Sequence, residues 1–425
     1  MKKSILVIAL LFPMILVAHS MDELFEALKN HPQTKLDIAN LKQANIGKKM
    51  VYSKLLPKID LVGSYDNYST PTGMVPVPPN KLLPMVKNPS VAQPFSENIY
   101  RAGVKLSMPL FVKSIYTNAK KLKVLQNTAR LKKIIDEQKN MSILVDADAN
   151  LLYLDSLIKA LNIKKKSLLK SKQTIDIQVK SGRLPQIASY KIENAINEIS
   201  IKENSIKMQK QKAISLIYSL TGIKLQNAID LEQLHDIQKN EIFLLKPLKE
   251  KIKAQKLELQ ATKEKLYPSL ALKGSYIYSK ADAYNNDKSV NEHYSDIGIG
   301  ASMPLFSMTN YRQIQMEKVK LLKKNYEYQK AKDELIAQTN MLEKSLKLLD
   351  KSIKLHKKNV QNQNELLKVA KISFESLRLS TEEYLRYEDA YIMAKAKLYE
   401  AQAKRWQTLM QLAVIYNNNI EELIK

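Results

Sequence analysis

The residues that most often do chemistry in proteins are few in this chain and widely separated. The histidines beyond residue 20 are His31, His235, His293 and His356, and none has a second histidine at the spacing of a metal site. There is no cysteine, so thiolate ligands, disulfides and thiol nucleophiles are excluded. The sequence has neither a glycine-rich phosphate loop nor a nucleophile elbow, and its 15 methionines are interpreted as packing residues. We therefore predict no catalytic residue, no metal and no cofactor.

Residues 1–20 have the pattern of a secretory signal. Lys2 and Lys3 precede the apolar stretch 5–17, and Ala18-His19-Ser20 supplies small residues for cleavage. The shortness of this stretch argues against the alternative of a membrane anchor. The formal net charge of the chain is +26, which in a cytosolic protein would suggest nucleic acid. Behind a secretory signal, the dispersed lysines are better explained as solvated helix faces.

Three landmarks occur twice in the same order. A Leu-Pro pair at 56–57 begins a segment that returns 211 residues later with Tyr-Pro at 267–268. A Met-Pro-Leu-Phe segment at 108–111 returns 195 residues later, and Arg183-Leu184 returns as Arg378-Leu379 with the same offset of 195. Matched landmarks in the same order predict two copies of one unit, residues 21–225 and 226–425.

Each predicted copy contains a pair of alternating segments, at about 58–69 and 98–109 in the first and about 268–279 and 294–304 in the second. Apolar and polar residues alternate there with a period of two, which predicts strands with one apolar and one polar face. About ten residues also suffice for a tilted strand to cross a bilayer. A soluble sandwich alternates in the same way, but four strands are too few for its core. Four strands cannot close a membrane barrel alone either, so several chains would have to share one barrel.

Long helices follow both strand pairs. No glycine or proline interrupts residues 113–181 or 307–374, and apolar residues recur there on heptad spacing. At 1.5 Å per residue, such a helix forms a rod of roughly 100 Å. Return helices are expected at about 186–220 and 241–266 in the first copy, and at about 381–416 together with the N-terminal 22–55 in the second. A compact bundle is the alternative, but the long stretches offer no turn. The chain is therefore predicted to form two long helical hairpins, with tips near 182 and 377.

In these features the chain resembles the TolC-type outer-membrane efflux factors. The resemblance covers essentially the whole chain beyond residue 20, and its features are the twofold repeat, the Pro-marked strand starts, the Gly-Ser-Tyr within each first strand and the Met-Pro-Leu-Phe segments. It implies a mainly α protein with a membrane β-barrel, in which a homotrimer shares twelve strands in the outer membrane and a helical coiled-coil barrel in the periplasm. It implies a passive exit duct and no enzyme. The partners would be a periplasmic adaptor and an inner-membrane transporter of the RND or ABC type, in a tripartite efflux pump or a type I secretion system.

The resemblance also suggests two sets of functional residues. The hairpin tips are where the adaptor docks in the family, and here they comprise Ser181, Gly182, Arg183, Leu184, Ser376, Leu377, Arg378, Leu379 and Ser380. The strand residues expected to face lipid are Ile59, Leu61, Tyr65, Leu106, Leu270, Leu272, Tyr276, Ile297 and Ile299. Leu377 stands where the first turn has Gly182, which argues against a strictly symmetric docking role.

Two other classes of protein are alternatives. A soluble periplasmic coiled-coil adaptor or scaffold would also have long hairpins, but adaptors carry compact β-domains around a single hairpin. A basic nucleic-acid-binding coiled coil would conflict with export. The sequence leaves open the cargo, the class of the cognate pump, the gating residues and the identity of the lysines that line the lumen.

Overall fold

The computed structural model describes residues 20–376 and 378–424, so most of the predicted signal, and Leu377, lie outside the described residues. Contacts between residues divide the chain into two compact units. We call them the helical unit, which comprises the residues up to Ala39 with Lys132–Leu245 and Lys332–Lys425, and the strand unit, which comprises Asn40–Leu131 and Lys246–Ala331. Each unit takes segments from both halves of the sequence, so this spatial division differs from the division into sequence repeats.

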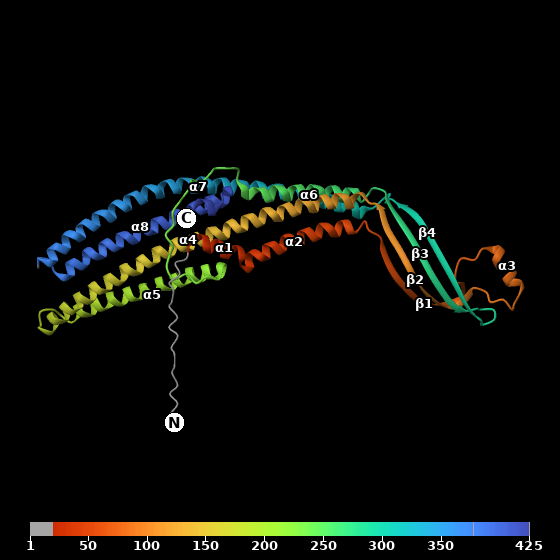
Figure 1. The fold of residues 1–425 in the computed structure, drawn as a ribbon, viewed down its shortest axis with the longest axis horizontal. Coiled ribbons are helices and arrows are strands. Elements are labelled where there is room, and N and C mark those ends of the chain that lie inside the picture. Colours follow the sequence, from red (N-terminus) through yellow and green to blue (C-terminus); the bar gives the residue numbers. More distant parts are fainter. Residues whose placement is uncertain (1–19, 377, 425) are drawn as a thin grey trace, which may run out of the picture. The chain divides into compact units, whose positions relative to one another are not determined.

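The strand unit contains one antiparallel sheet in the order β1-β2-β3-β4 (Figure 1). Its strands are β1 (Lys58–Gly73), β2 (Phe95–Phe111), β3 (Ser269–Asp282) and β4 (Ser289–Ser302). Each pair of strands extends toward its connecting loop beyond the range that the alternation predicts. The extra residues still pair through the backbone, as Thr72 with Ser96 and Ala281 with Val290 show. Backbone pairing therefore extends beyond the residues in which apolar and polar side chains alternate.

The two loops at the end of the sheet are joined to each other. The proline-rich loop between β1 and β2 contains a short helix, α3 (Pro79–Lys87), which begins with proline at its first position. The Asn285 amide, from the β3–β4 turn, donates to the carbonyls of Pro89 and Val91 at 3.2 and 2.9 Å. The same side chain accepts from the Gln93 amide at 3.0 Å. One asparagine therefore holds both ends of the segment that follows α3.

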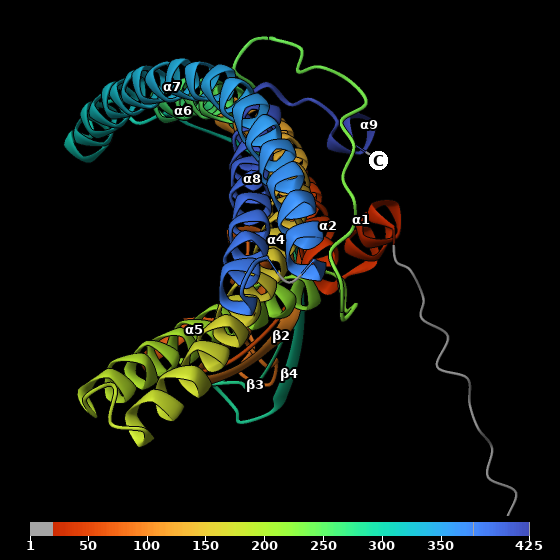
Figure 2. The same cartoon turned by 90° about the vertical axis from the view of Figure 1, so that its left-hand side faces the viewer.

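Two helical hairpins follow the strand pairs. The outgoing helices, α4 (Lys113–Lys180) and α7 (Met308–Glu375), each have 68 residues. The return helices are α5 (Ile187–Thr221) and α8 (Thr381–Tyr416). An ion pair joins the two helices of each hairpin at equivalent positions, 195 residues apart. Lys210 contacts Asp155 at 2.6 Å in the first hairpin, and Arg405 contacts Asp350 at 2.6 Å in the second. Within the helical unit the four helices lie side by side in the order α7-α8-α4-α5 (Figures 1 and 2).

The N-terminal segment differs from the single helix expected at 22–55. It forms α1 (Met21–Asn30) and α2 (Pro32–Ser53), with a break at His31. His31 has an extended backbone with ψ near 151°, because the proline that follows disfavours the helical conformation at the preceding residue. The helix expected at 241–266 is also shorter, since α6 covers Lys246–Glu264 after the 3₁₀ turn η1 (Phe243–Leu245).

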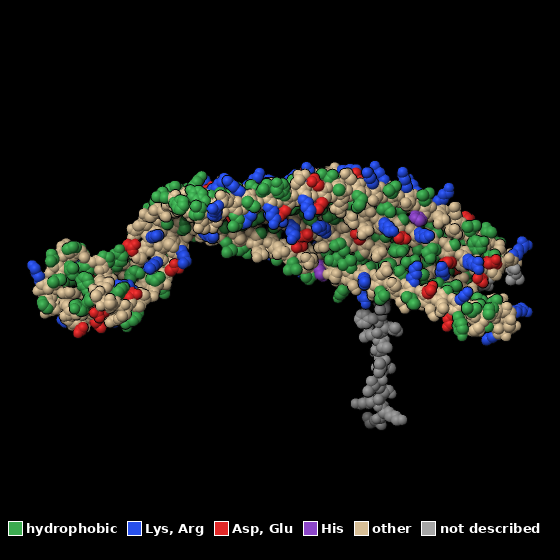
Figure 3. Space-filling model, turned by 180° about the vertical axis from the view of Figure 1, so that it is seen from behind, with side chains coloured by type: hydrophobic (Ala, Val, Ile, Leu, Met, Phe, Trp, Pro, Cys, Tyr) green, Lys and Arg blue, Asp and Glu red, His purple; other side chains and the backbone are tan. Residues whose placement is uncertain are grey.

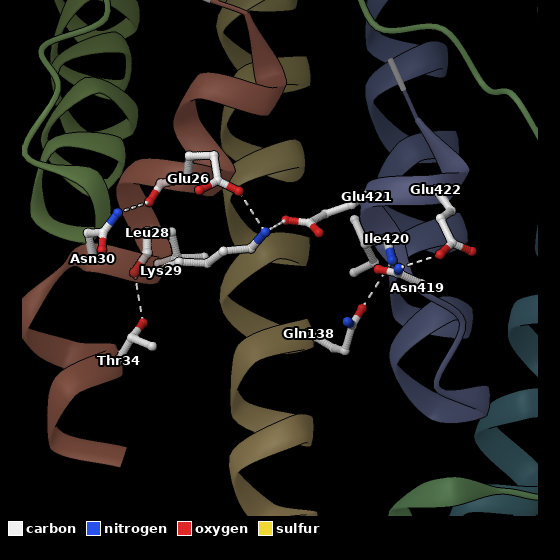
Figure 4. A network of polar contacts seen from close by, with 10 residues as sticks. All are labelled: Glu26, Leu28, Lys29, Asn30, Thr34, Gln138, Asn419, Ile420, Glu421 and Glu422. Atoms are coloured by element: carbon white, nitrogen blue, oxygen red, sulfur yellow. Dashed lines mark hydrogen bonds and ion pairs between the residues drawn. The ribbon is translucent and has the colours of Figure 1, made fainter. Parts of the chain in front are cut away.

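The main hydrophobic core lies in the helical unit, where α1, α4, α5 and α8 meet the terminal helix α9 (Ile420–Leu423). Leu144, Leu151, Ile217 and Met410 in this core are fully buried. Polar contacts join α1 to the C-terminal segment that contains α9 (Figure 4). Lys29 of α1 forms ion pairs with Glu26 at 2.8 Å and with Glu421 at 2.7 Å. The first and last helices that the structure describes are thereby fastened to each other.

Candidate functional site: a two-faced sheet and two helical turns

All nine strand residues that were expected to face lipid lie on one face of the sheet. The register pairs Ile59 with Leu106 and Leu272 with Ile299, and directly paired residues share a face. In the single chain this face is open, since Leu61 is 86% exposed and Ile297 is 76% exposed. A contiguous strip of exposed aliphatic side chains is suited to contact with hydrocarbon.

Aromatic residues follow the aliphatic strip on the same face, nearer the loops. The Tyr65 and Tyr100 rings have centroids 4.8 Å apart, and the Tyr276 ring lies 5.9 Å from the His293 ring. The Tyr65 hydroxyl donates to Asn98 Oδ1 at 2.9 Å, so the polar end of this ring is satisfied. Strand propensity alone also enriches tyrosine, and Tyr68 lies on the opposite face near the same end of the sheet. Such a band is typical of the boundary between hydrocarbon and water.

The opposite face of the sheet carries charged and hydroxyl side chains, together with a small buried apolar cluster that includes Ile99 and Ala281. The Arg101 guanidinium forms an ion pair with Asp66 and donates to the Tyr68 hydroxyl at 3.1 Å. The Ser275 hydroxyl likewise donates to Asp296 across the β3–β4 pair. These residues alternate along the strands with those of the aliphatic strip. The exposed charged and hydroxyl groups therefore lie on the face opposite the aliphatic strip.

The two outer strands of the sheet have unpaired edges. Among the strands that the structure describes, β1 pairs only with β2 and β4 pairs only with β3. Each outer strand therefore offers backbone amide and carbonyl groups to a further strand. An edge next to an apolar face cannot remain unpaired in hydrocarbon, because nothing there replaces the missing hydrogen bonds.

The first helical turn ends α4 in a Schellman motif. Gly182 has a φ of +70°, the left-handed conformation that glycine adopts without steric cost. The Arg183 amide donates to the Gln178 carbonyl at 2.9 Å and the Gly182 amide to the Val179 carbonyl at 3.0 Å, which is the bonding pattern of this motif. The predicted glycine reversal is thus present, and it leaves Ser181, Gly182 and Arg183 exposed.

The second turn keeps the hydrogen bond that spans five residues in the first turn. The Arg378 amide donates to the Ser373 carbonyl at 2.8 Å, the equivalent of the Arg183 bond. Ser380 then caps α8 in a reciprocal capping box with Glu383. The Phe374 and Tyr384 rings stack at 5.0 Å across the turn, a contact for which the first turn has Val179 and Ser189 in the equivalent positions.

The tip residues differ in exposure. Arg183 and Arg378 are exposed, as are Ser376 and Ser380. Leu184 and Leu379, which belong to the same predicted tips, are only partly exposed. The arginines are therefore the largest fully exposed side chains named in the two turns.

Two carboxylates that the sequence analysis did not single out contact the segment between α5 and η1. Asp148 on α4 is fully buried and accepts from the Ile229 amide at 2.9 Å. Burial raises the pKa of Asp148 to about 7. Glu343 on α7 instead contacts Lys239 at 2.6 Å and accepts from the Tyr416 hydroxyl at 2.9 Å. The hydrogen bond from Lys239 lowers the pKa of Glu343.

Other kinds of site receive no support from the geometry. In residues 20–376 and 378–424, no group of three or more acidic or histidine side chains is placed to hold a metal ion. No helix in the part of the chain that the structure describes is sufficiently long and apolar to span a membrane. Lysine and arginine side chains are spread along the helices with acidic residues among them (Figure 3). This distribution agrees with solvated helix faces.

The fold is that of bacterial outer-membrane channels. The chain is similar to the CmeC outer membrane channel of Campylobacter jejuni, with 16% identity, a TM-score of 0.70, and coverage of 93% of this chain and 84% of that one. It is also similar to VceC of Vibrio cholerae, with 12% identity, a TM-score of 0.66 and coverage of 92% and 95%. The open MtrE channel of Neisseria gonorrhoeae gives 14% identity, a TM-score of 0.66 and coverage of 95% and 90%.

Residues 245–418 match the outer membrane efflux protein family. No curated protein matches the chain in sequence. The family match and the shared fold together confirm the resemblance to the TolC-type efflux factors that the sequence predicted. The family and the similar structures are transport channels and not enzymes. They give no support to the adaptor, scaffold or nucleic-acid alternatives.

Proposed function

We propose that this protein is the outer-membrane exit channel of a tripartite efflux pump or a type I secretion system. The observation that carries the proposal is the sheet, which combines an exposed aliphatic strip, an aromatic band and two unpaired edges. Further strands must pair with those edges in lipid. Three copies with four strands each supply twelve strands, which is enough to close a barrel. The aliphatic strip then contacts outer-membrane lipid and the polar face lines the channel.

In this arrangement the helical unit lies in the periplasm and continues the channel as a coiled-coil barrel. The two turns would meet a periplasmic adaptor, which joins the channel to an inner-membrane transporter of the RND or ABC class. Exposed Arg183 and Arg378 recur at equivalent positions of the two hairpins, which supports a role in this contact. Copurification of the transporter with the channel would distinguish a pump from a secretion system.

The assembly is tested by the native mass of the protein extracted from membranes with detergent. We expect a stable particle of three chains. Recovery of a monomer from the soluble periplasm without detergent would overturn the proposal, because the aliphatic strip would then never contact lipid.

The docking role of the turns is tested by Arg183→Glu combined with Arg378→Glu. We expect export to be lost while the yield of the three-chain particle is unchanged. The matched control is Lys202→Glu with Lys397→Glu, which makes the same charge change at exposed positions of α5 and α8 that are also 195 residues apart. Normal export by the arginine variant would exclude a docking role for these residues.

A further inference from the structure

A pocket of about 370 Å³ lies within the strand unit, on the sheet face opposite the aliphatic strip. Its floor is an apolar row that crosses all four strands at one level of the register. The row consists of Val62, Gly103, Ile277 and Tyr294. A Cβ atom at Gly103 would lie 2.8 Å from Ile277 Cδ1, so the Ile277 side chain lies over the glycine. The floor is therefore apolar from β1 to β4.

The loop between β1 and β2 forms a wall of the pocket. Beyond the end of β1 the chain folds back over this face, and Met74 and Pro76 line the pocket. The Ser279 hydroxyl donates to the Met74 carbonyl at 3.3 Å, and the Met74 side chain is buried. The β1–β2 loop spans residues 74–94, whereas the β3–β4 turn spans 283–288. The longer loop therefore supplies the wall that encloses the space above the apolar row.

Two cations of β2 line the pocket on either side of the apolar row. Arg101 lies two residues from Gly103 toward the loops, and Lys105 lies two residues from it toward α4. Arg101 Nη1 donates to Asp66 and to the Tyr68 hydroxyl, which leaves further guanidinium donors available to a ligand.

The Lys105 side chain has neither an ion pair nor a hydrogen bond in the part of the chain that the structure describes. The nearest carboxylates in the register already have partners. Asp60, which pairs with Lys105 across the strands, contacts Lys58 at 2.8 Å. Asp296 accepts from the Ser275 hydroxyl. Lys105 is therefore the cation of this pocket that an anionic ligand can reach without displacing another contact.

The two cations are specific to the first strand pair. The positions 195 residues further on, in β4, are Asp296 and Gly300. A strand of this repeat therefore does not need a cation at either position in order to form. The second strand pair also lacks the long loop that walls the pocket. The cations and the wall thus occur together in one copy of the repeat, which favours a shared role in holding a ligand.

We propose that this pocket binds an organic anion with an apolar body, with the anionic group at Lys105 and the apolar body on the row of Val62, Ile277 and Tyr294. This inference rests on the proposed function, which places this face of the sheet inside the channel. Apolar walls with a few polar groups are the usual form of a small-molecule site, and 370 Å³ lies near the lower end of the usual range of roughly 300–1,000 Å³. An anion with two fused rings suits such a volume.

Calorimetric titration with naphthalenesulfonate tests the site in the membrane-extracted particle, after its transfer to lipid nanodiscs. We expect saturable binding of one probe per chain, and none to nanodiscs without protein. Naphthylmethylammonium has the same rings and the opposite charge, so it should not bind. Benzenesulfonate keeps the charge but loses one ring, so its affinity should be about tenfold lower because less apolar surface is buried.

A pair of lysine variants separates the pocket from the general charge of the face. Lys105→Gln removes the cation of the pocket, and we expect the affinity for naphthalenesulfonate to fall about tenfold because a charge-assisted hydrogen bond is lost. The matched control is Lys273→Gln, which removes an exposed lysine from the same face outside the pocket and should leave the affinity unchanged. Both variants should keep the native mass of the wild type.

Three results would overturn the inference while leaving the proposed channel intact. These are a three-chain particle that does not bind naphthalenesulfonate, equal binding of the sulfonate and the ammonium probe, and equal losses of affinity in Lys105→Gln and Lys273→Gln. The last result would show that the whole face attracts anions without a defined site. A wild-type monomer from the soluble periplasm would instead overturn the proposed function, and with it the place of the pocket in a channel.

Discussion

Asp148 and Glu343 occupy equivalent positions in the two hairpins, 195 residues apart, yet their surroundings shift their protonation in opposite directions. Asp148 is buried and receives only the neutral Ile229 amide, while its second oxygen has no partner among the described residues. Glu343 receives the Lys239 ammonium and the Tyr416 hydroxyl. Burial without a cation raises the pKa of Asp148 to about 7, whereas the bond from Lys239 lowers that of Glu343.

The comparison shows that equivalent positions of the two hairpins can contact the same segment while the pKa of the carboxylate shifts in opposite directions. Both carboxylates hold residues of the segment between α5 and η1, since Ile229 and Lys239 both belong to it. The anchoring bond is therefore common to the two hairpins. The donors and the charge balance around the two carboxylates differ, and pH is the variable that separates the two cases.

The largest effect is expected for Asp148→Asn. The folded pKa of Asp148 lies above its ordinary value near 4, so the folded chain holds this proton more tightly and stability falls as the pH rises from about 4 to about 7. Asparagine keeps an acceptor for the Ile229 amide and removes the buried charge. We expect a gain in unfolding free energy of up to about 4 kcal/mol at pH 8, falling toward zero at pH 4. Denaturant unfolding of the detergent-solubilised protein at several pH values measures it.

The control for that variant is Glu198→Gln, which removes an exposed carboxylate from the same unit. A gain for Asp148→Asn that does not depend on pH would show that its carboxyl is not protonated in the folded protein. The two hairpins would then not differ in the way described.

Glu343→Gln should change stability in the opposite sense. Because the folded pKa of Glu343 is lowered, its contribution is present above the ordinary glutamate value and is lost as the pH falls through the folded value. Glutamine still accepts from Tyr416 but has no charge for Lys239. We expect a loss of about 1 kcal/mol at pH 8 that disappears at low pH, because Lys239 is largely exposed and the ion pair is screened by solvent. Lys239→Ala should reproduce most of this loss, and an unchanged free energy in both variants would contradict it.

Gly182→Ala tests whether the first turn depends on glycine. A Cβ atom in the left-handed conformation costs about 1 kcal/mol, so we expect a loss of that size in unfolding free energy. The matched control is Gly47→Ala, because Gly47 lies inside α2 with open space around it and no positive φ. That substitution should stabilise the protein by about 0.5–1 kcal/mol. Losses of equal size at both glycines would exclude a conformational explanation.

The smallest effect is expected where the return helices begin. Ser380→Ala removes the side-chain acceptor of the Glu383 amide and should cost about 0.5–1 kcal/mol. The start of α5 has no such cap, since Gln186 makes no side-chain capping bond. Gln186→Ala should therefore leave the unfolding free energy unchanged. Thermal unfolding of the two variants side by side measures the difference, and a larger loss for Gln186→Ala would reverse the comparison.

The features that could be predicted from the sequence are those with a local cause. The alternation of apolar and polar residues predicted that every second residue of a strand lies on the same face of the sheet. The register confirms that Ile59 and Leu106 share one face. The turn at Gly182 also has a local cause, because glycine adopts the left-handed conformation without steric cost. The break at His31 also has a local cause in Pro32, but the helical pattern on both sides concealed it.

The features that could not be predicted depend on residues far apart in the sequence. Asn285 reaches carbonyls that lie 194 and 196 residues earlier, and nothing near Asn285 indicates this. Asp148 meets the Ile229 amide 81 residues later. Periodicity identifies an element and its faces, whereas the partner of a face is decided by packing.

The register of the sheet also has a consequence for how the chain folds. The strands β3 and β4 are joined by the short turn 283–288, so they can pair as soon as both have been synthesised. The central pairing of β2 with β3 joins Leu106 to Gly274, which are 168 residues apart, and both hairpin helices α4 and α5 lie between them. Contacts at such separation form slowly, because a long loop must close before they are gained. We expect two independent strand pairs to form early, and the β2–β3 seam to be the slow step at which a chain is most exposed to pairing with the wrong copy.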